Sequence, residues 1–119
     1  MTPKATVRHA GNVAVVDLSG KITLGDGSGL VRNTIKDLLA AGSKNILLNL
    51  KDVSYIDSAG LGEIVGSYAT VANQGGAIKL LNVQGKVTDL LQVTNLYTVF
   101  ATFSDEETAI RTYSASASA

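Results

Sequence analysis

Short β-prone runs alternate with amphipathic helical stripes along most of the chain, and few folds accommodate that alternation. The run Asn45–Leu50 is densely apolar, too short for a helix and bounded by turn residues, so it predicts a strand covered on both faces. Strands separated by helices of this length are joined by right-handed parallel crossovers. The alternation therefore predicts an α/β protein with a largely parallel sheet.

The N-terminal part departs from this pattern, because two strands follow each other without a helix. The runs Ala5–Ala10 and Val13–Leu18 flank Gly11-Asn12, a dipeptide typical of a two-residue hairpin turn. Gly20 is expected to close the second strand. The predicted sheet is therefore mixed, with an N-terminal β-hairpin followed by βα repeats and about four helices.

The periodicity of apolar residues and the positions of glycines predict the remaining helices and strands. These are helices from Leu30 to about Gly42, Leu61 to Ala72 and Val87 to Thr94, strands at Ala77–Asn82 and Tyr97–Phe103, and a last helix through Tyr113. Ser104 and Glu107 form a capping-box pattern at the start of that last helix. Gly25–Gly29 predicts a turn that caps the first helix, because the glycine spacings of nucleotide-binding loops are absent.

The composition excludes several classes of function. Ten basic residues balance ten acidic ones, so no net charge attracts nucleic acid or an anionic membrane. Cysteine is absent and His9 is the single histidine, which argues against thiol chemistry, a histidine triad and a multi-histidine zinc site. Acidic residues are scattered over separate loops. We therefore expect no metal and no cofactor, and these residue types exclude many classes of enzyme.

Length and the end segments suggest one domain in the cytoplasm. The chain has 119 residues, of which 1–113 are assigned to a single domain and the Ser/Ala segment 114–119 to a disordered tail. No apolar run approaches the roughly 18–20 residues that cross a bilayer. The first residues also lack the apolar stretch of a secretory signal.

The loops that follow parallel strands meet at one edge of a sheet, where ligands and partners usually bind. Within that edge, Asp57 is a good N-cap, and Ile56 and Leu61 then take the positions of a hydrophobic staple. Ser58 becomes the first helical residue, with its hydroxyl beside amides that favour a phosphate. Asp-Ser is also ordinary capping chemistry, so a structural role and a switch both remain open.

Gly60 and Gly62 lie in the first turns of the same helix, where each costs about 1 kcal/mol relative to alanine. Capping requires neither of them. A bare helix start that admits another backbone would explain both glycines, and so would close packing of the helix against the sheet.

The segment Asp57-Ser-Ala-Gly-Leu-Gly62, preceded by Leu48–Ile56, resembles the signature of bacterial anti-sigma factor antagonists. These are single-domain members of the family named for sulfate transporters and anti-sigma factor antagonists (STAS). The likeness covers about Ala5 to Tyr113, and Gly75-Gly76 and Leu90–Tyr97 match in order. The resemblance implies the STAS fold and a protein without catalysis of its own.

In that family the serine after the aspartate is phosphorylated by an anti-sigma factor that is also a serine kinase. The unphosphorylated form binds the kinase and releases the sigma factor, and a metal-dependent serine phosphatase restores it. The resemblance thus implies that Ser58 is the phosphoacceptor and that Asp57 orients its hydroxyl at the partner surface. Gly60, Leu61 and Gly62 would form the helix start on which the partner rests.

Two departures from the family pattern bear on partner choice. Many members carry Gly-Glu-Leu-Asp after the second strand, whereas this chain has Gly20-Lys-Ile-Thr23. Lys21 and Thr23 are therefore assigned to the partner surface with a changed charge, which would support a phosphoserine. Ala59 replaces the second serine of a common Asp-Ser-Ser sequence, so Ser58 is the single acceptor in the motif. The alternative role is a non-catalytic STAS scaffold in a signalling complex or transport system.

Overall fold

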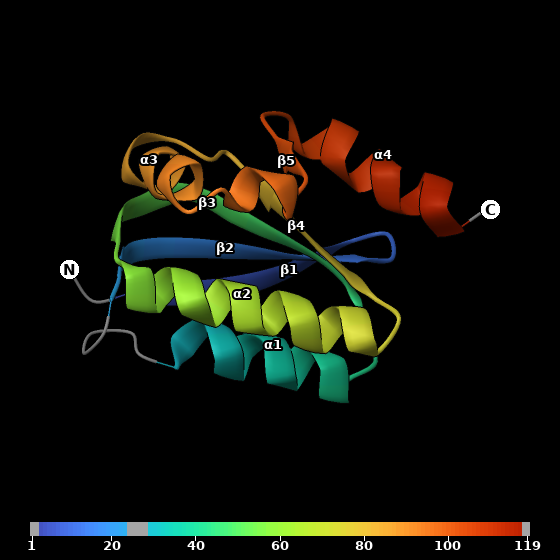
Figure 1. Ribbon diagram of the computed structural model, residues 1–119. Coiled ribbons are helices and arrows are strands. Elements are labelled where there is room, and N and C mark those ends of the chain that lie inside the picture. The colour runs from blue at the N-terminus through green and yellow to red at the C-terminus, as the bar shows by residue number, and fades with distance from the viewer. Residues whose placement is uncertain (1–2, 24–28, 118–119) are drawn as a thin grey trace.

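The computed structural model describes residues 3–23 and 29–117 (Figure 1). Its elements are β1 (Lys4–Ala10), β2 (Val13–Ile22), α1 (Leu30–Ala40), β3 (Asn45–Ile56), α2 (Ser58–Asn73), β4 (Ala77–Leu81), α3 (Gly85–Val93), a 3₁₀ turn (Leu96–Thr98), β5 (Thr102–Phe103) and α4 (Glu106–Ala117). The predicted N-terminal hairpin followed by βα repeats, with four helices, is confirmed.

The five strands form one mixed sheet in the order β1-β2-β3-β4-β5. Strand β1 is antiparallel to β2, and every later pair is parallel. Crossovers between parallel strands are right-handed almost without exception, so crossovers that advance in one direction place their helices on one face. Figure 1 shows α1 and α2 side by side across that face.

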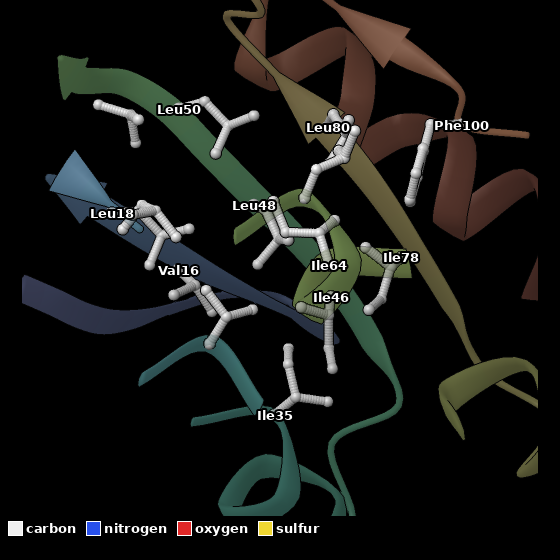
Figure 2. Packing of buried hydrophobic residues seen from close by; sticks show 14 of the residues in the cluster. Val16, Leu18, Ile35, Ile46, Leu48, Leu50, Ile64, Ile78, Leu80 and Phe100 are labelled. Atoms are coloured by element: carbon white, nitrogen blue, oxygen red, sulfur yellow. The ribbon is translucent and has the colours of Figure 1, made fainter. Parts of the chain in front are cut away.

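Alternate residues of the strands face the main core, which lies between the sheet and helices α1, α2 and α3. Leu48 of β3 and Ile64 of α2 are fully buried in it, and Ile35 of α1 closes one side (Figure 2). Phe100 joins this core from the segment before β5 and meets the ring of Tyr68 edge-on, with 5.2 Å between ring centroids. The dense apolar run predicted for β3 is thus covered on this face.

Helix α4 covers the opposite face of the sheet. Ala109 and Tyr113 of α4 pack with Val15 and Leu47 in a second buried cluster. The Tyr113 hydroxyl donates to the backbone carbonyl of Ile46, which satisfies a phenol buried at 2 % exposure. Burial raises the pKa of Tyr113. Both faces of β3 are therefore buried, as the apolar run predicts.

An ion-pair cluster also links α4 to the hairpin. Arg8 of β1 donates from Nε to Asp17 Oδ2 at 2.6 Å and from Nη1 to Glu106 Oε2 at 2.8 Å. These hydrogen bonds from Arg8 hold the pKa of both the Asp17 and Glu106 carboxyls below their usual range. The cluster joins β1, β2 and the first turn of α4.

Strand β2 extends past Gly20, where the sequence predicts its end. Gly20 has φ +84°, a left-handed conformation that glycine adopts readily, and the pairing register with β3 shifts between Gly20 and Lys21. The strand continues through this bulge to Ile22. As a result Lys21 lies opposite Tyr55 and Ile22 opposite Ile56 at the end of β3.

The predicted strand Tyr97–Phe103 is wrong over most of its length. Asn95 adopts a left-handed backbone with φ 62°, a 3₁₀ turn follows, and Phe100 turns into the core. Thr102–Phe103 alone pair with β4. The β-prone side chains of this segment pack against the core and do not belong to a paired strand. Residue propensity alone does not distinguish these two roles. Tyr97, at the start of the predicted strand, is exposed at 38 %.

The start and end of α4 also differ from prediction. Asp105, and not Ser104, caps the helix, since Asp105 Oδ2 accepts from the Thr108 amide at 2.9 Å. The helix continues to Ala117, so residues 114–117 are helical where a disordered tail was expected; alanine favours helix strongly. Residues 118–119 and most of the predicted turn Gly25–Gly29 lie outside the described residues.

The Arg8 cluster predicts a pH dependence of stability. Carboxyls whose pKa falls on folding add stability above their unfolded pKa of about 4, and this stability is lost as pH falls through the folded pKa. We expect Arg8→Ala to lower the free energy of unfolding at neutral pH by about 0.5–1 kcal/mol, since the pairs are partly exposed. Urea titrations between pH 7 and pH 3 should show that acidification lowers the free energy of unfolding less in Arg8→Ala than in wild type. An equal decrease in the free energy of unfolding in both proteins would contradict the role of Arg8. Lys44→Ala is the control and should behave as wild type.

Candidate functional site

The junction between β3 and α2 is capped as predicted. Asp57 has extended backbone, and its Oδ1 accepts from the Gly60 amide at 2.8 Å. The Asp57 carbonyl accepts from the Leu61 amide at 2.9 Å, the first backbone bond of the helix. Ser58 is therefore the first residue of α2, and its side chain is exposed.

The predicted hydrophobic staple lies on the core side of the junction. Ile56 before the cap and Leu61 in the first turn are each 3 % exposed and belong to the main core. Burial on both sides of the cap sets the direction in which the chain enters the helix. The burial of Ile56 and Leu61 thus leaves Ser58, which lies between them in the chain, on the solvent side of the junction.

Gly60 and Gly62 have different surroundings, which separates the two explanations left open by the sequence. A Cβ on Gly60 would lie 2.1 Å from the carbonyl oxygen of Ile22, so close packing against β2 requires this glycine. A Cβ on Gly62 would meet no described atom within 4 Å, and Gly62 is exposed. Packing therefore explains Gly60 and leaves Gly62 unexplained.

The end of β2 supplies the other predicted site residues. Because β2 and β3 run parallel and end together, Lys21 lies opposite Tyr55, three residues before Ser58 along β3 and its exit. The side chain of Lys21 is exposed and that of Thr23 is half-buried. The Asp57 amide donates to the Ile22 carbonyl at 3.4 Å, which joins the two strand ends. The expected gathering of these segments at one sheet edge is observed.

Ala59 is half-buried and faces the neighbouring helix α1, where it lines a pocket with Arg32 and Gly62. Leu61 and Gly60, by contrast, are buried. The predicted partner-binding residues therefore divide into an exposed group, which includes Lys21, and an interior group.

Glu63 has a role that the sequence did not reveal. Its carboxylate accepts from the backbone amides of Gly29 at 2.7 Å and Arg32 at 3.4 Å, so a side chain of α2 caps the N-terminus of α1. The signal in the sequence is indirect: Gly29 stands at the cap position and has no side chain with which to cap. This contact fixes the start of α1 beside the first turns of α2.

Ser58 lines a pocket of about 430 Å³ that combines apolar side chains with the carboxylates of Asp57 and Asp89. Tyr55, Leu90 and Val93 line it together with Asp57, and Val93 at the end of α3 is 83 % exposed. Tyr55, which is 40 % exposed, lines the same pocket, and exposed apolar side chains that adjoin one another favour contact with another protein. The sequence predicts that Asn82–Lys86, the segment leading into α3, shares the sheet edge with Val53–Leu61, and the structure adds that Leu90 and Val93 of α3 border Ser58.

Neither a metal centre nor a membrane span is found in the described part of the chain. Residues 3–23 and 29–117 hold no group of three or more histidine, aspartate or glutamate side chains that could bind a metal ion. His9 lies on β1 opposite Ala14, in the hairpin. None of the described helices is long and apolar enough to cross a membrane.

A family model described as STAS domain matches residues 4–109, and the chain belongs to the STAS domain family. The predicted family and fold are therefore confirmed. An anti-sigma-B factor antagonist of Bacillus subtilis is 33% identical over 96 residues, which are 81% of this chain and 86% of that protein. Neither the family model nor this relative has the name of an enzyme.

Solved structures show the same fold. A putative anti-sigma factor antagonist from Thermotoga maritima has a TM-score of 0.82 at 23% identity, over 90% of this chain and 92% of that one. The phosphorylated form of the Bacillus cell fate determinant SpoIIAA has a TM-score of 0.72 at 21% identity, over 92% of this chain and 99% of that one.

The two glycines provide a matched test of this geometry. We expect Gly60→Ala to lower the free energy of unfolding by about 1–3 kcal/mol, because its methyl group collides with backbone at Ile22. Gly62→Ala on the same helix should raise it by about 0.5–1 kcal/mol, because the methyl group enters open space and alanine favours helix. Urea unfolding of both variants measures the contrast. Equal effects of the same sign would mean that α2 does not abut β2 as described.

Proposed function

We propose that this chain is an anti-sigma factor antagonist that works by partner switching. Unphosphorylated Ser58 is available to an anti-sigma factor that is also a serine kinase, and binding of that kinase frees the sigma factor. Phosphorylation of Ser58 ends the complex, and a metal-dependent serine phosphatase reverses it. The exposed hydroxyl of Ser58 at the first residue of α2 carries the proposal. This role belongs in the cytoplasm, where transcription takes place.

The charge at the helix start explains how one phosphoryl group changes the surface. It adds about −1.5 to −2 charges at neutral pH beside the Asp57 carboxylate. The positive end of the helix dipole supports that charge in the free protein. A partner seated over Ser58 must instead desolvate a dianion, which is costly without a dedicated cation. Lys21 at the neighbouring strand end is a cation of this chain that favours the free phosphorylated form.

The proposed partner surface comprises the predicted site residues that are exposed or half-buried. Lys21, Thr23, Asp57, Ala59 and Gly62 border Ser58 at the end of β2 and along α2. The buried Gly60 and Leu61 contribute by setting where the helix begins. The Bacillus subtilis relative supports the proposal through its name, and SpoIIAA supports it as a protein of the same fold solved in a phosphorylated form.

The test is phosphorylation and binding by the anti-sigma serine kinase purified from the same organism. With ATP we expect mass spectrometry to locate phosphate on Ser58, and Ser58→Ala to accept none while still binding. Ser58→Asp should weaken binding by about tenfold or more, equivalent to about 1.4 kcal/mol. The nearby exposed Ser54 is the control, and Ser54→Ala should behave as wild type.

Phosphate on Ser54, or on Ser58→Ala, would contradict the site. Equal affinity of the kinase for wild type and Ser58→Asp would contradict partner switching and favour the scaffold role, in which Ser58 is not a switch.

A further inference from the structure

A groove runs between α1 and α2 and begins next to Ser58. Two adjoining pockets of about 380 and 420 Å³ form it, and both are lined by Arg32, Lys36 and Thr70. The groove extends along α2 from Ala59 to Gln74, which is about 22 Å at the helical rise per residue. This length equals about four turns of a second helix.

Glycines one turn apart line this groove. Gly62 and Gly66 are both exposed, and a Cβ on either would meet no described atom within 4 Å. Neither glycine has a left-handed backbone. Each therefore weakens α2 relative to alanine, while no contact or conformation in the described chain requires it. Close approach of another backbone along α2 would require both.

A buried hydroxyl gives an independent sign that the groove is incomplete. Ser67 lines it at 4 % exposure, and its Oγ has no hydrogen-bond partner among the described residues. A buried polar group without a partner destabilises the protein that contains it. Because the Oγ itself has almost no accessible surface, a polar group in the groove would become its partner only after the Ser67 side chain rotates toward the groove.

The charge beside the groove indicates the chemistry of the occupant. Arg32 and Lys36 are exposed and lie one turn apart on α1. The Glu63 carboxylate accepts from the amides of Gly29 and Arg32, so it is engaged at the start of α1. The groove thus presents small residues on the α2 side and two cations on the α1 side.

We infer that this groove binds a helix of the anti-sigma kinase, with acidic side chains of that helix facing Arg32 and Lys36. The inference rests on the proposed function and extends its partner surface from Ser58 along α2. Helix-in-groove docking is a common mode of peptide recognition, and small residues permit the close approach that it needs here. Docking along α2 would hold Ser58 at a constant position relative to the kinase.

Gly66→Ala is the main test, because Gly66 lies away from the phosphorylation site. Its melting temperature should rise by about 2–5 °C, since the methyl group enters open space on a helix. Its affinity for the purified kinase, measured by calorimetry, should fall by about tenfold. Ala72→Leu, an exposed change on α2 outside the groove, should leave the affinity unchanged.

Two further variants test the charge and the hydroxyl. Arg32→Glu with Lys36→Glu should weaken kinase binding by about tenfold or more, whereas Lys44→Glu, also exposed, should not. Ser67→Ala should leave the melting temperature at or above that of wild type and weaken binding by about threefold. A lower melting temperature in Gly66→Ala or Ser67→Ala would overturn the inference, because the space or the hydroxyl would then already be used.

The outcomes separate this inference from the proposed function. Unchanged kinase affinity in the groove variants, with phosphate on Ser58, overturns the groove and leaves the switch intact. Groove-dependent binding without modification of Ser58 supports the groove and contradicts the switch, whereas no binding to wild type contradicts both. If wild type is a dimer in sedimentation and Gly66→Ala is a monomer with unchanged kinase affinity, the occupant is a second copy and the inference is overturned.

Discussion

The contact between Gly60 and the carbonyl of Ile22 governs the arrangement of the site. Because Gly60 has no Cβ, α2 can begin directly against the end of β2, at a distance that any side chain would prevent. The Asp57 amide donates to the same carbonyl, and the Asp57 carboxylate caps the helix that begins there. Ile56 is buried below the cap, and Ser58, which follows Asp57, is exposed. The exposure of Ser58 is therefore a consequence of close packing beneath it.

Helix α2 has two faces with different requirements. Its inner face includes Gly60 and Ile64, which pack against the sheet and are buried. Its outer face carries Gly62 and Gly66, for which the described chain provides no neighbour. The glycine on the inner face permits a close contact within the chain. The glycines on the outer face lower the stability of the helix, and no contact within the described chain compensates for that loss. The proposed docking of a protein along α2 would explain Gly62 and Gly66 in the same way that the contact with β2 explains Gly60: in each case the missing Cβ admits another backbone.

Local patterns predicted the parts of the fold that depend on neighbours in sequence. The Gly11-Asn12 turn, the buried run of β3 and the cap at Asp57 all follow from short-range periodicity and turn chemistry, and the structure confirms them. The prediction of a strand from Tyr97 was wrong, because Phe100 packs into a core formed by residues that are distant in the sequence. Residue Glu63 was missed because its partner amides at the start of α1 lie more than thirty positions earlier in the chain.

The sequence alone determined the class of fold, the order of its elements and the residue that stands first in α2, because these depend on apolar spacing and on capping within a few residues. Tertiary structure decided what each glycine is for, which strand ends meet and how α1 and α2 enclose a groove between them. Those properties depend on distances between segments that are remote along the chain. Two glycines that lie two positions apart in the same helix, Gly60 and Gly62, differ in role because a Cβ on one would meet the Ile22 carbonyl and a Cβ on the other would enter open space.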